Sequence, residues 1–327
     1  MKKRAKICVT GGAGFIGSSF VIKAVLSDFE VLVLDNLTYA ASEENLMEVS
    51  DNSLFSFKKE DICNYENLAS CISKFKPDFI VNFAAESHVD NSITSPKIFM
   101  DTNVFGTFNL LEIIRHLKSK NTEIKFIHVS TDEVYGSLGE TGKFTEDSPY
   151  KPNSPYSATK ACSDHLVRAW FETYEVPSVI TNCCNNFGPR QHAEKFIPKI
   201  INSLLNNIKM TIYATGSNVR EWIFVEDHNE GLLKIVSNFE AGRRYNIGSG
   251  VEKSNMEVFR EVFKQLTSRG LVSKKFEETY VQVEDRAGHD FRYALDSSNF
   301  QSMLGWQART SFEEAISMTI DHYINET

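Results

Sequence analysis

The sequence lacks any long apolar stretch. A membrane-spanning helix needs about 20 consecutive, predominantly apolar residues, and no such run occurs among the 327 residues. The beginning, MKKRAKICVTGGAGFIG, joins positive charge to apolar residues, but its apolar part is short and interrupted by glycines, unlike a signal peptide. We therefore expect a protein with no membrane partner.

Basic residues are fewer than acidic residues in this chain. The chain has 35 Lys and Arg residues against 43 Asp and Glu residues, which gives a formal net charge of −8. This balance disfavours nucleic acid as a partner. An anionic small molecule remains compatible with it where a few basic side chains and backbone N–H groups converge.

Cysteine is sparse as well, with six residues, no CxxC pair and no spacing typical of metal ligands. The pattern predicts no metal site, and it indicates reduced thiols in a cytoplasmic protein. Two of the six are adjacent, Cys183 and Cys184, and the sequence assigns them no role.

The composition that remains is typical of a globular protein, with 42% hydrophobic and 24% charged residues. In the first half, short β-rich apolar segments alternate with helical patterns. We expect strands at residues 6–10, 31–35, 55–59, 79–83, 126–130 and 178–182, and helices at 15–28, 65–74, 98–119 and 157–174. This alternation predicts an α/β fold with a doubly wound parallel sheet that is covered on both faces.

The alternation becomes less regular after residue 185. Strand candidates at 211–215, 222–226 and 244–248 mix with helical patterns near 195–207, 228–238, 255–267 and 311–323. We expect residues 1–185 to form the sheet domain and residues 186–327 to form a smaller C-terminal α/β region that binds substrate. Segments of the two can interleave, and a ligand cleft is expected between them.

A glycine-rich turn, VTGGAGFIGSSF, follows the first expected strand. Gly11, Gly14 and Gly17 permit a tight turn, close approach of the backbone to a pyrophosphate, and close packing of helix on sheet. Asp35 ends the second expected strand, where a carboxylate binds the adenosine ribose hydroxyls, so the spacing predicts a Rossmann site that prefers NAD to NADP. The same site is consistent with residues after the third and fourth strands, namely Asp61, Ile62, Ala84 and Ala85.

The segment PYSATKA places Tyr156 and Lys160 four residues apart on an expected helix, and hence on one face. A nearby ammonium favours the phenolate, so Tyr156 is a candidate base near neutral pH. Ser130 and Thr131 strengthen this interpretation, because they end the preceding strand of the same expected sheet.

In combination, these residues resemble the extended short-chain dehydrogenase/reductases that act on nucleotide sugars. The similarity is greatest to nucleoside-diphosphate-glucose 4,6-dehydratases, and it runs almost from end to end through GGAGFIGS, DNLTYAAS, AAESHVDNSI, STDEVYG, PYSATKA, NNFGPRQHAEKFIPK and NVREWIFVEDH. Its most specific part is Thr131-Asp132-Glu133, because the related epimerases lack this acid pair.

The resemblance implies an NAD-dependent hydro-lyase. Tyr156 takes the proton of the sugar's 4-hydroxyl, which Thr131 also contacts, while Lys160 holds the nicotinamide ribose. Glu133 removes the carbon 5 proton, and protonated Asp132 donates to the departing 6-hydroxyl. After hydride returns to carbon 6, the product is a 4-keto-6-deoxy sugar nucleotide made from dTDP-glucose or UDP-glucose.

The resemblance also assigns binding residues. Further cofactor contacts are implied at Phe15, Ile16, Asn36, Leu37, Thr38, Thr102, Ser130 and Asn186. Substrate contacts are implied at Ser87, His88, Asn185, Lys195, Phe196, Tyr213, Arg220, Asn255, Arg286, His289 and Tyr293. A homodimer is implied through the helices expected at 98–119 and 157–174.

Two other functions stay open. A nucleotide-sugar 4-epimerase would share Tyr156, Lys160 and NAD but would have no need of the Asp132 and Glu133 pair. A non-catalytic NAD-binding scaffold would be expected to have lost one of these side chains, and all four are present. The sequence does not choose between a dTDP-sugar and a UDP-sugar.

Overall fold

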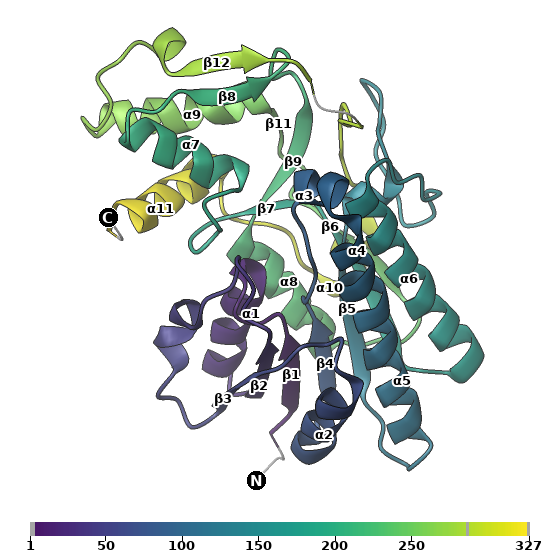
Figure 1. Ribbon diagram of the computed structural model, residues 1–327. Coiled ribbons are helices and arrows are strands. Elements are labelled where there is room, and N and C mark those ends of the chain that lie inside the picture. The colour runs from purple at the N-terminus through teal and green to yellow at the C-terminus, as the bar shows by residue number, and fades with distance from the viewer. Residues whose placement is uncertain (1–3, 286–287, 326–327) are drawn as a thin grey trace.

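The computed structural model describes residues 4–285 and 288–325. Its centre is a seven-stranded sheet in which every neighbouring pair of strands is parallel (Figure 1). The predicted α/β fold with a doubly wound Rossmann sheet is therefore confirmed. In spatial order the strands are β10 (Arg244–Ile247), β6 (Ser178–Cys183), β5 (Lys125–Thr131), β4 (Phe79–Asn82), β1 (Lys6–Thr10), β2 (Glu30–Asp35) and β3 (Phe55–Lys59).

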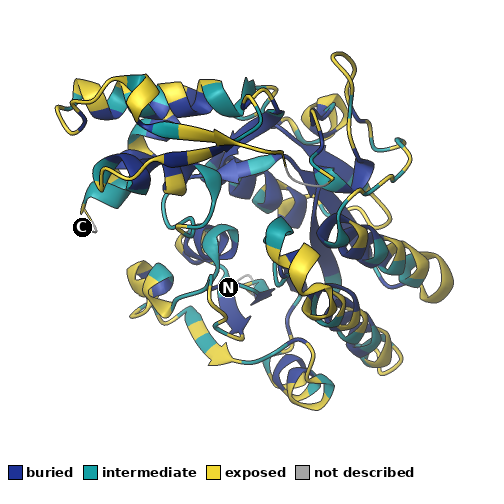
Figure 2. Ribbon diagram, turned by 45° about the horizontal axis from the view of Figure 1, so that its top comes forward, coloured by how far each residue is buried: buried dark blue, intermediate teal, exposed yellow. Residues whose placement is uncertain are grey.

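Both faces of the sheet are covered, because alternate residues of a strand point to opposite sides. In β1, Ile7 and Val9 belong to one apolar core and Cys8 to another. Figure 2 shows the resulting concentration of buried residues in the sheet. The first core lies against α1 (Phe15–Leu26), η1 (Glu43–Val49), α8 (Val225–Ser237) and α10 (Ser298–Leu304), and the second against α2 (Tyr65–Phe75), α5 (Thr107–Lys118) and α6 (Pro155–Tyr174).

A smaller α/β region lies at one end of the central sheet (Figure 1). It has a core of its own, which includes Trp222, Phe259 and Ile316. Its sheets are β11-β9-β7, from Glu252–Ser254, Val219–Phe224 and Asn185–Phe187, and β12-β8, from Tyr280–Val283 and Met210–Tyr213. Its helices are α7 (Phe196–Leu205), α9 (Asn255–Ser268), η4 (Phe276–Glu278) and α11 (Phe312–Asn325).

The helix predicted over residues 98–119 is interrupted in the structure. After α3 (Val89–Thr94), α4 (Pro96–Phe99) runs into the π-helix η2 (Met100–Gly106), which continues as α5. From this wider turn the Asn103 side chain accepts a hydrogen bond from Glu86 N (2.8 Å) and donates one to Thr159 Oγ1 (2.9 Å). Short π segments are frequent at functional sites. The apolar spacing of the sequence did not reveal this one, because one extra residue in a turn hardly changes that spacing.

Helix α6 begins at a capping box. The Ser154 hydroxyl accepts from Ser157 N, and the Ser157 hydroxyl accepts from Ser154 N, each over 3.1 Å. Pro155 occupies the first helical position, where its missing N–H costs nothing. This start fixes which face of α6 meets the sheet, and Tyr156 and Lys160 are buried on it.

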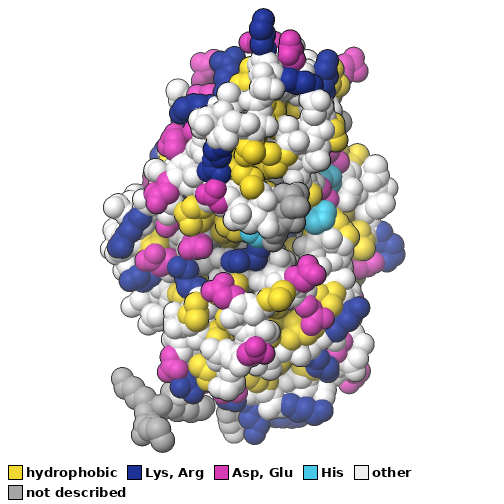
Figure 3. Space-filling view, turned by 90° about the vertical axis from the view of Figure 1, so that its left-hand side faces the viewer, with side chains coloured by type: hydrophobic (Ala, Val, Ile, Leu, Met, Phe, Trp, Pro, Cys, Tyr) yellow, Lys and Arg dark blue, Asp and Glu magenta, His cyan; other side chains and the backbone are white. Residues whose placement is uncertain are grey.

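Within residues 4–285 and 288–325, no helix combines the length and the apolar character needed to cross a bilayer. On the face shown in Figure 3, acidic and basic side chains are interspersed.

Gly17 lies where α1 meets the glycine-rich turn, and a Cβ there would stand 2.2 Å from the Gly11 carbonyl oxygen. Because that oxygen belongs to the backbone, Gly17→Ala is expected to lower the free energy of unfolding by about 1–3 kcal/mol, measured by urea denaturation. Gly139→Ala is the matched control, since a Cβ at that position meets nothing within 4 Å. Equal unfolding midpoints for the two variants would contradict the close approach.

Candidate active site

A cleft with a cavity volume of about 330 Å³ opens between the central sheet and the smaller region. It lies at the carboxyl ends of β1, β2, β4, β5 and β6, around the point where the strand order reverses between β1 and β4. Doubly wound sheets bind their ligands at this position.

Most of the predicted cofactor residues line this cleft. Those that do are Gly11, Gly14, Phe15, Ile16, Gly17, Asp35, Asn36, Thr38, Asp61, Ile62, Ala84, Ala85, Thr102, Ser130, Tyr156, Lys160 and Asn186. Leu37 is placed differently, since its side chain packs against the first core of the sheet.

The glycine turn has the shape that a dinucleotide requires. A Cβ at Gly11 would lie 2.5 Å from Ala84 N, so the first turn and the segment after β4 leave no room for a side chain between their backbones. Asp35 accepts hydrogen bonds from Ala13 N (2.9 Å) and Leu37 N (2.8 Å), one on each carboxyl oxygen. Both oxygens keep lone pairs for further donors such as ribose hydroxyls. The residues present therefore fit NAD.

The acid pair follows β5 in the short 3-10 helix η3 (Asp132–Tyr135). The Thr131 hydroxyl donates to Asp132 Oδ1 (3.2 Å) and accepts from Glu133 N (3.3 Å), which fixes the turn. This turn buries the Asp132 side chain and leaves Glu133 partly exposed.

The two acids differ in environment. Burial raises the pKa of Asp132 well above its usual range, and the nearby carboxylates of Glu133 and Glu221 raise it further. Asp132 Oδ2 is buried without a hydrogen-bond partner among the described residues. Asp132 is therefore suited to carry a proton at neutral pH while a second carboxyl stands beside it.

Tyr156 and Lys160 lie side by side with this pair in the lining of the cleft. Burial raises the pKa of Tyr156, and the negative charge of Glu133 raises it further, while a hydrogen bond with Thr131 opposes both. The spacing of Tyr156 and Lys160 in the sequence predicts the opposite direction. This prediction is wrong for the protein alone, because burial and the negative charges of Glu133 and Asp132 disfavour the phenolate, while the Lys160 ammonium donates to the Val129 carbonyl (2.8 Å).

The predicted substrate residues form two groups. Ser87, Asn185 and Lys195 line the cleft, and Lys195 Nζ donates to the Ser87 carbonyl (3.1 Å) and hydroxyl (3.3 Å) across it. Close by, His88 Nε2 lies 3.8 Å from a carboxylate oxygen of Glu194.

The second group lies in or next to the smaller region and does not line the cavity. The Arg220 guanidinium stacks on the Tyr293 ring at 4.4 Å, and its NH2 nitrogen donates to the Asp290 carbonyl (3.0 Å). The Tyr213 and His289 rings meet edge to face at 6.0 Å. Phe196 and Asn255 begin α7 and α9. Arg286 lies outside the described residues.

Some lining residues were not anticipated, namely Glu86, Cys183, Cys184, Gln191 and His192. Glu86 follows the predicted Ala85 after β4, and Cys184 precedes the predicted Asn185 after β6. Their positions near the ends of these strands could have indicated them. Gln191 and His192 come from the loop between β7 and α7, within the segment NNFGPRQHAEKFIPK that carries the family resemblance, so that segment could have indicated them.

Comparisons with known proteins identify relatives of this chain. The model of the family described as GDP-mannose 4,6 dehydratase matches residues 8–319. The dTDP-glucose 4,6-dehydratase of Xanthomonas campestris pv. campestris (strain B100) is 45% identical over 327 residues, which cover 98% of this chain and 93% of that protein. The crystal structure of DesIV, a dTDP-glucose 4,6-dehydratase from Streptomyces venezuelae with NAD and TYD bound, has a TM-score of 0.90 at 41% identity, with 98% of this chain and 97% of that chain covered.

The UDP-glucose 4-epimerase of Thermotoga maritima, solved with UDP-glucose, has nearly the same fold, with a TM-score of 0.87 over 98% of this chain and 99% of that chain. Its sequence identity is only 26%. Fold similarity thus extends to epimerases, whereas the high identity is with dehydratases. The chain belongs to the nucleotide-sugar 4,6-dehydratase family of the extended short-chain dehydrogenase/reductases.

Proposed function

We propose that this protein is an NAD-dependent dTDP-glucose 4,6-dehydratase, a hydro-lyase that forms the 4-keto-6-deoxy sugar nucleotide. The observation that carries the proposal is the acid pair Asp132 and Glu133, which lines the same cleft as Tyr156 and Lys160. The dTDP-sugar is favoured over a UDP-sugar by the relatives, which are named dTDP-glucose 4,6-dehydratases.

Residues 1–185 would hold NAD, and residues 186–327 would supply most nucleotide-sugar contacts. The C-terminal half also contributes β10, α8 and α10 to the larger unit, so the two segments interleave. The glycine turn and Asp35 would bind the adenosine end, and Lys160 would bind the nicotinamide ribose. NAD supplies a hydride acceptor for carbon 4 and later a donor for carbon 6.

Tyr156 and Thr131 would act on the sugar's 4-oxygen. Tyr156 would take the hydroxyl proton as the ketone forms, which requires its raised pKa to fall, and the positive charge of a bound nicotinamide would lower it. Lys160 reinforces this effect only while it is an ammonium. Thr131, which lines the cleft with Tyr156, would hold the same oxygen in line.

Asp132 and Glu133 would carry out the elimination of water. Once carbon 4 is a ketone, the carbon 5 proton is acidified and passes to Glu133. Asp132, which is kept protonated by burial, gives its proton to the departing 6-hydroxyl. Glu133 finally returns a proton to carbon 5, and the proton taken up by Tyr156 balances the one that Asp132 lost.

A 4-epimerase would need only the Tyr156 and Lys160 half of this arrangement. The epimerase reaction has no step for Asp132, a buried acid whose pKa is raised by burial and by the neighbouring Glu133 carboxylate. The non-catalytic scaffold is disfavoured for the same reason, because a buried acid with an unsatisfied oxygen is costly to retain without a role.

Replacing Glu133 by Gln removes the base at carbon 5 but keeps the size of the side chain. With dTDP-glucose, the rate of 4-keto-6-deoxy product formation is expected to fall by about 10²–10⁴-fold. Oxidation at carbon 4 should persist and be visible as accumulated reduced cofactor. The NAD affinity, measured by calorimetry, serves as the control and should stay unchanged. Full dehydration by Glu133→Gln would refute the role of this residue and, with it, the assignment of the acid pair.

We further propose a homodimer through the outer surface of η2, α5 and α6. These elements pack together on one side of the molecule (Figure 1). Phe105 on η2 is 56% exposed. Ile98 on the adjoining α4 is 49% exposed, and Tyr174 at the end of α6 is 43% exposed. Exposed apolar side chains distributed along one group of helices in this way favour a protein interface.

A charge placed in this patch should separate the subunits. Phe105→Asp is expected to shift the sedimentation coefficient from that of a dimer to that of a monomer at micromolar concentration. Ile208→Asp is the matched control, because Ile208 is 62% exposed but follows α7 in the smaller region. If both variants sediment like the parent protein, the proposed interface is wrong.

A further inference from the structure

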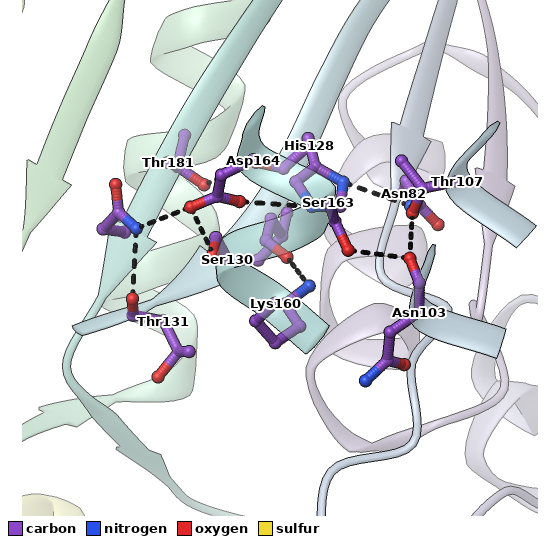
Figure 4. Close-up of polar contacts among 12 residues, drawn as sticks. Asn82, Asn103, Thr107, His128, Ser130, Thr131, Lys160, Ser163, Asp164 and Thr181 are labelled. Atoms are coloured by element: carbon purple, nitrogen blue, oxygen red, sulfur yellow. Dashed lines mark hydrogen bonds and ion pairs between the residues drawn. The ribbon is translucent and has the colours of Figure 1, made fainter. Parts of the chain in front are cut away.

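Asp164 is a buried acid that no step of the proposed reaction uses. It lies on α6 one turn after Lys160, with no exposed surface. Its Oδ2 accepts hydrogen bonds from Ser130 Oγ (2.9 Å), Tyr150 Oη (2.6 Å) and Asn182 Nδ2 (3.3 Å). Figure 4 shows it between Ser130 and His128, facing the sheet.

The other carboxyl oxygen of Asp164 faces His128. His128 Nε2 and Asp164 Oδ1 are 3.4 Å apart, and among the described residues both atoms are buried without a hydrogen bond of regular geometry. Burial lowers the pKa of His128 well below its usual value, so the ring is neutral and carries one proton. The position of that proton decides whether the two groups attract or repel.

The neighbours of Asn82 fix that position. The Thr107 hydroxyl donates its proton to the Asn103 carbonyl (2.7 Å), so toward Asn82 Nδ2 (3.5 Å) it can only accept. The Nδ2 group therefore occupies the side of Asn82 that also faces His128 Nδ1 (3.2 Å), while Thr10 Oγ1 donates to Oδ1 on the other side (2.7 Å). His128 Nδ1 is consequently an acceptor, and the ring proton resides on Nε2.

Every group that faces Asp164 is thus a donor, which is the environment of a carboxylate rather than of a carboxylic acid. One helical turn away, the Lys160 ammonium donates to the Val129 carbonyl. The two side chains are four residues apart on the same buried face of α6. A single buried charge is costly, and an opposite charge nearby reduces that cost.

We propose that Asp164 is a positioning residue, whose carboxylate, one helical turn from Lys160 on the same buried face of α6, keeps the Lys160 ammonium charged where it donates to the Val129 carbonyl. Asp164 contacts neither sugar nor cofactor and acts only through Lys160. The inference rests on the proposed function for the role of Lys160 in the reaction, but not for the existence of the charge pair.

The surrounding charges are consistent with this pairing. Burial lowers the pKa of Lys160, and the Asp164 charge raises it. Burial raises the pKa of Asp164, and Lys160 lowers it together with the donors from Tyr150 and Ser130. The other titratable or charged groups that face the pair are His128 on β5, Tyr135 on η3, Cys183 on β6 and Arg244 on β10.

Asp164→Asn removes the charge and keeps the shape. In the pH profile of kcat for dehydration, the alkaline limb, where Lys160 loses its proton, is expected to move down by about one pH unit or more. The KM for dTDP-glucose should change by less than about threefold, because no substrate contact is lost. A fall in kcat with both limbs unmoved would mean a merely structural role and would overturn the proposal.

Two control variants separate charge from other effects. Asp51→Asn removes an exposed carboxylate elsewhere and should leave the profile unchanged. Tyr150→Phe removes one donor to Asp164 but keeps its charge, so the alkaline limb should stay within about 0.3 pH units of the parent value, well below the shift expected for Asp164→Asn. A shift in Tyr150→Phe equal to that in Asp164→Asn would contradict the charge argument.

A double-mutant cycle in thermal unfolding tests the pair without any activity. Lys160→Met and Asp164→Asn should each lower the melting temperature, and the double variant should lose less than the sum of the two losses. Additive losses of melting temperature would contradict the pairing. If Asp164→Asn alone fails to fold, a double variant that also fails to fold would contradict the pairing as well. A parent protein without dehydratase activity but with this coupling would refute the proposed function and leave the charge pair standing.

Discussion

The parallel register of β5 with β4 and β6 determines where the buried polar groups of this protein lie. It sets Asn82 beside His128 and Ser130 beside Asn182. A row of polar side chains therefore crosses the sheet just below its carboxyl edge. In an apolar interior such groups must satisfy one another, so the row also fixes protonation states, and Asp164 receives only donors.

At the carboxyl edge the same constraint leads to chemistry. The strand ends, the capped start of α6 and the turn of η3 bring the acid pair, Tyr156 and Lys160 into one cleft. Burial then acts on each group separately. It raises the pKa values of Asp132 and Tyr156 and lowers that of Lys160. In the protein alone Tyr156 therefore disfavours the phenolate form that a base requires, and a bound nicotinamide cation would add a positive charge beside it.

The fold was largely predictable from the sequence, because its strands are buried on both faces and its helices have clear apolar periodicity. The expected strands at 6–10 and 55–59 match β1 and β3, and the helix expected at 157–174 matches α6 to within two residues. Cleft residues such as Asp35 and Thr131 were found because strand ends meet at one edge of a parallel sheet.

Features that depend on contacts distant in sequence were not predictable. The hydrogen bonds of Asp164 join α6 to β5, β6 and the loop before α6, and no local pattern encodes them. The short strands β7, β11 and β12 are stabilised by their partners rather than by their own composition. The direction of the Tyr156 pKa was mispredicted because helical spacing shows that Lys160 is near, but not that Tyr156 is buried beside the carboxylates of Glu133 and Asp132.

The carboxylate of Glu133 at the end of β5 is expected to remove the carbon 5 proton, exchange it with solvent and then deliver a proton back to carbon 5. Conversion of dTDP-glucose in deuterated water, followed by NMR of the product, measures this step. The expected result is a 4-keto-6-deoxy product with one deuterium at carbon 5 and none from solvent at carbon 6. An epimerised sugar nucleotide without deuterium, or a dehydrated product with hydrogen retained at carbon 5, would contradict it.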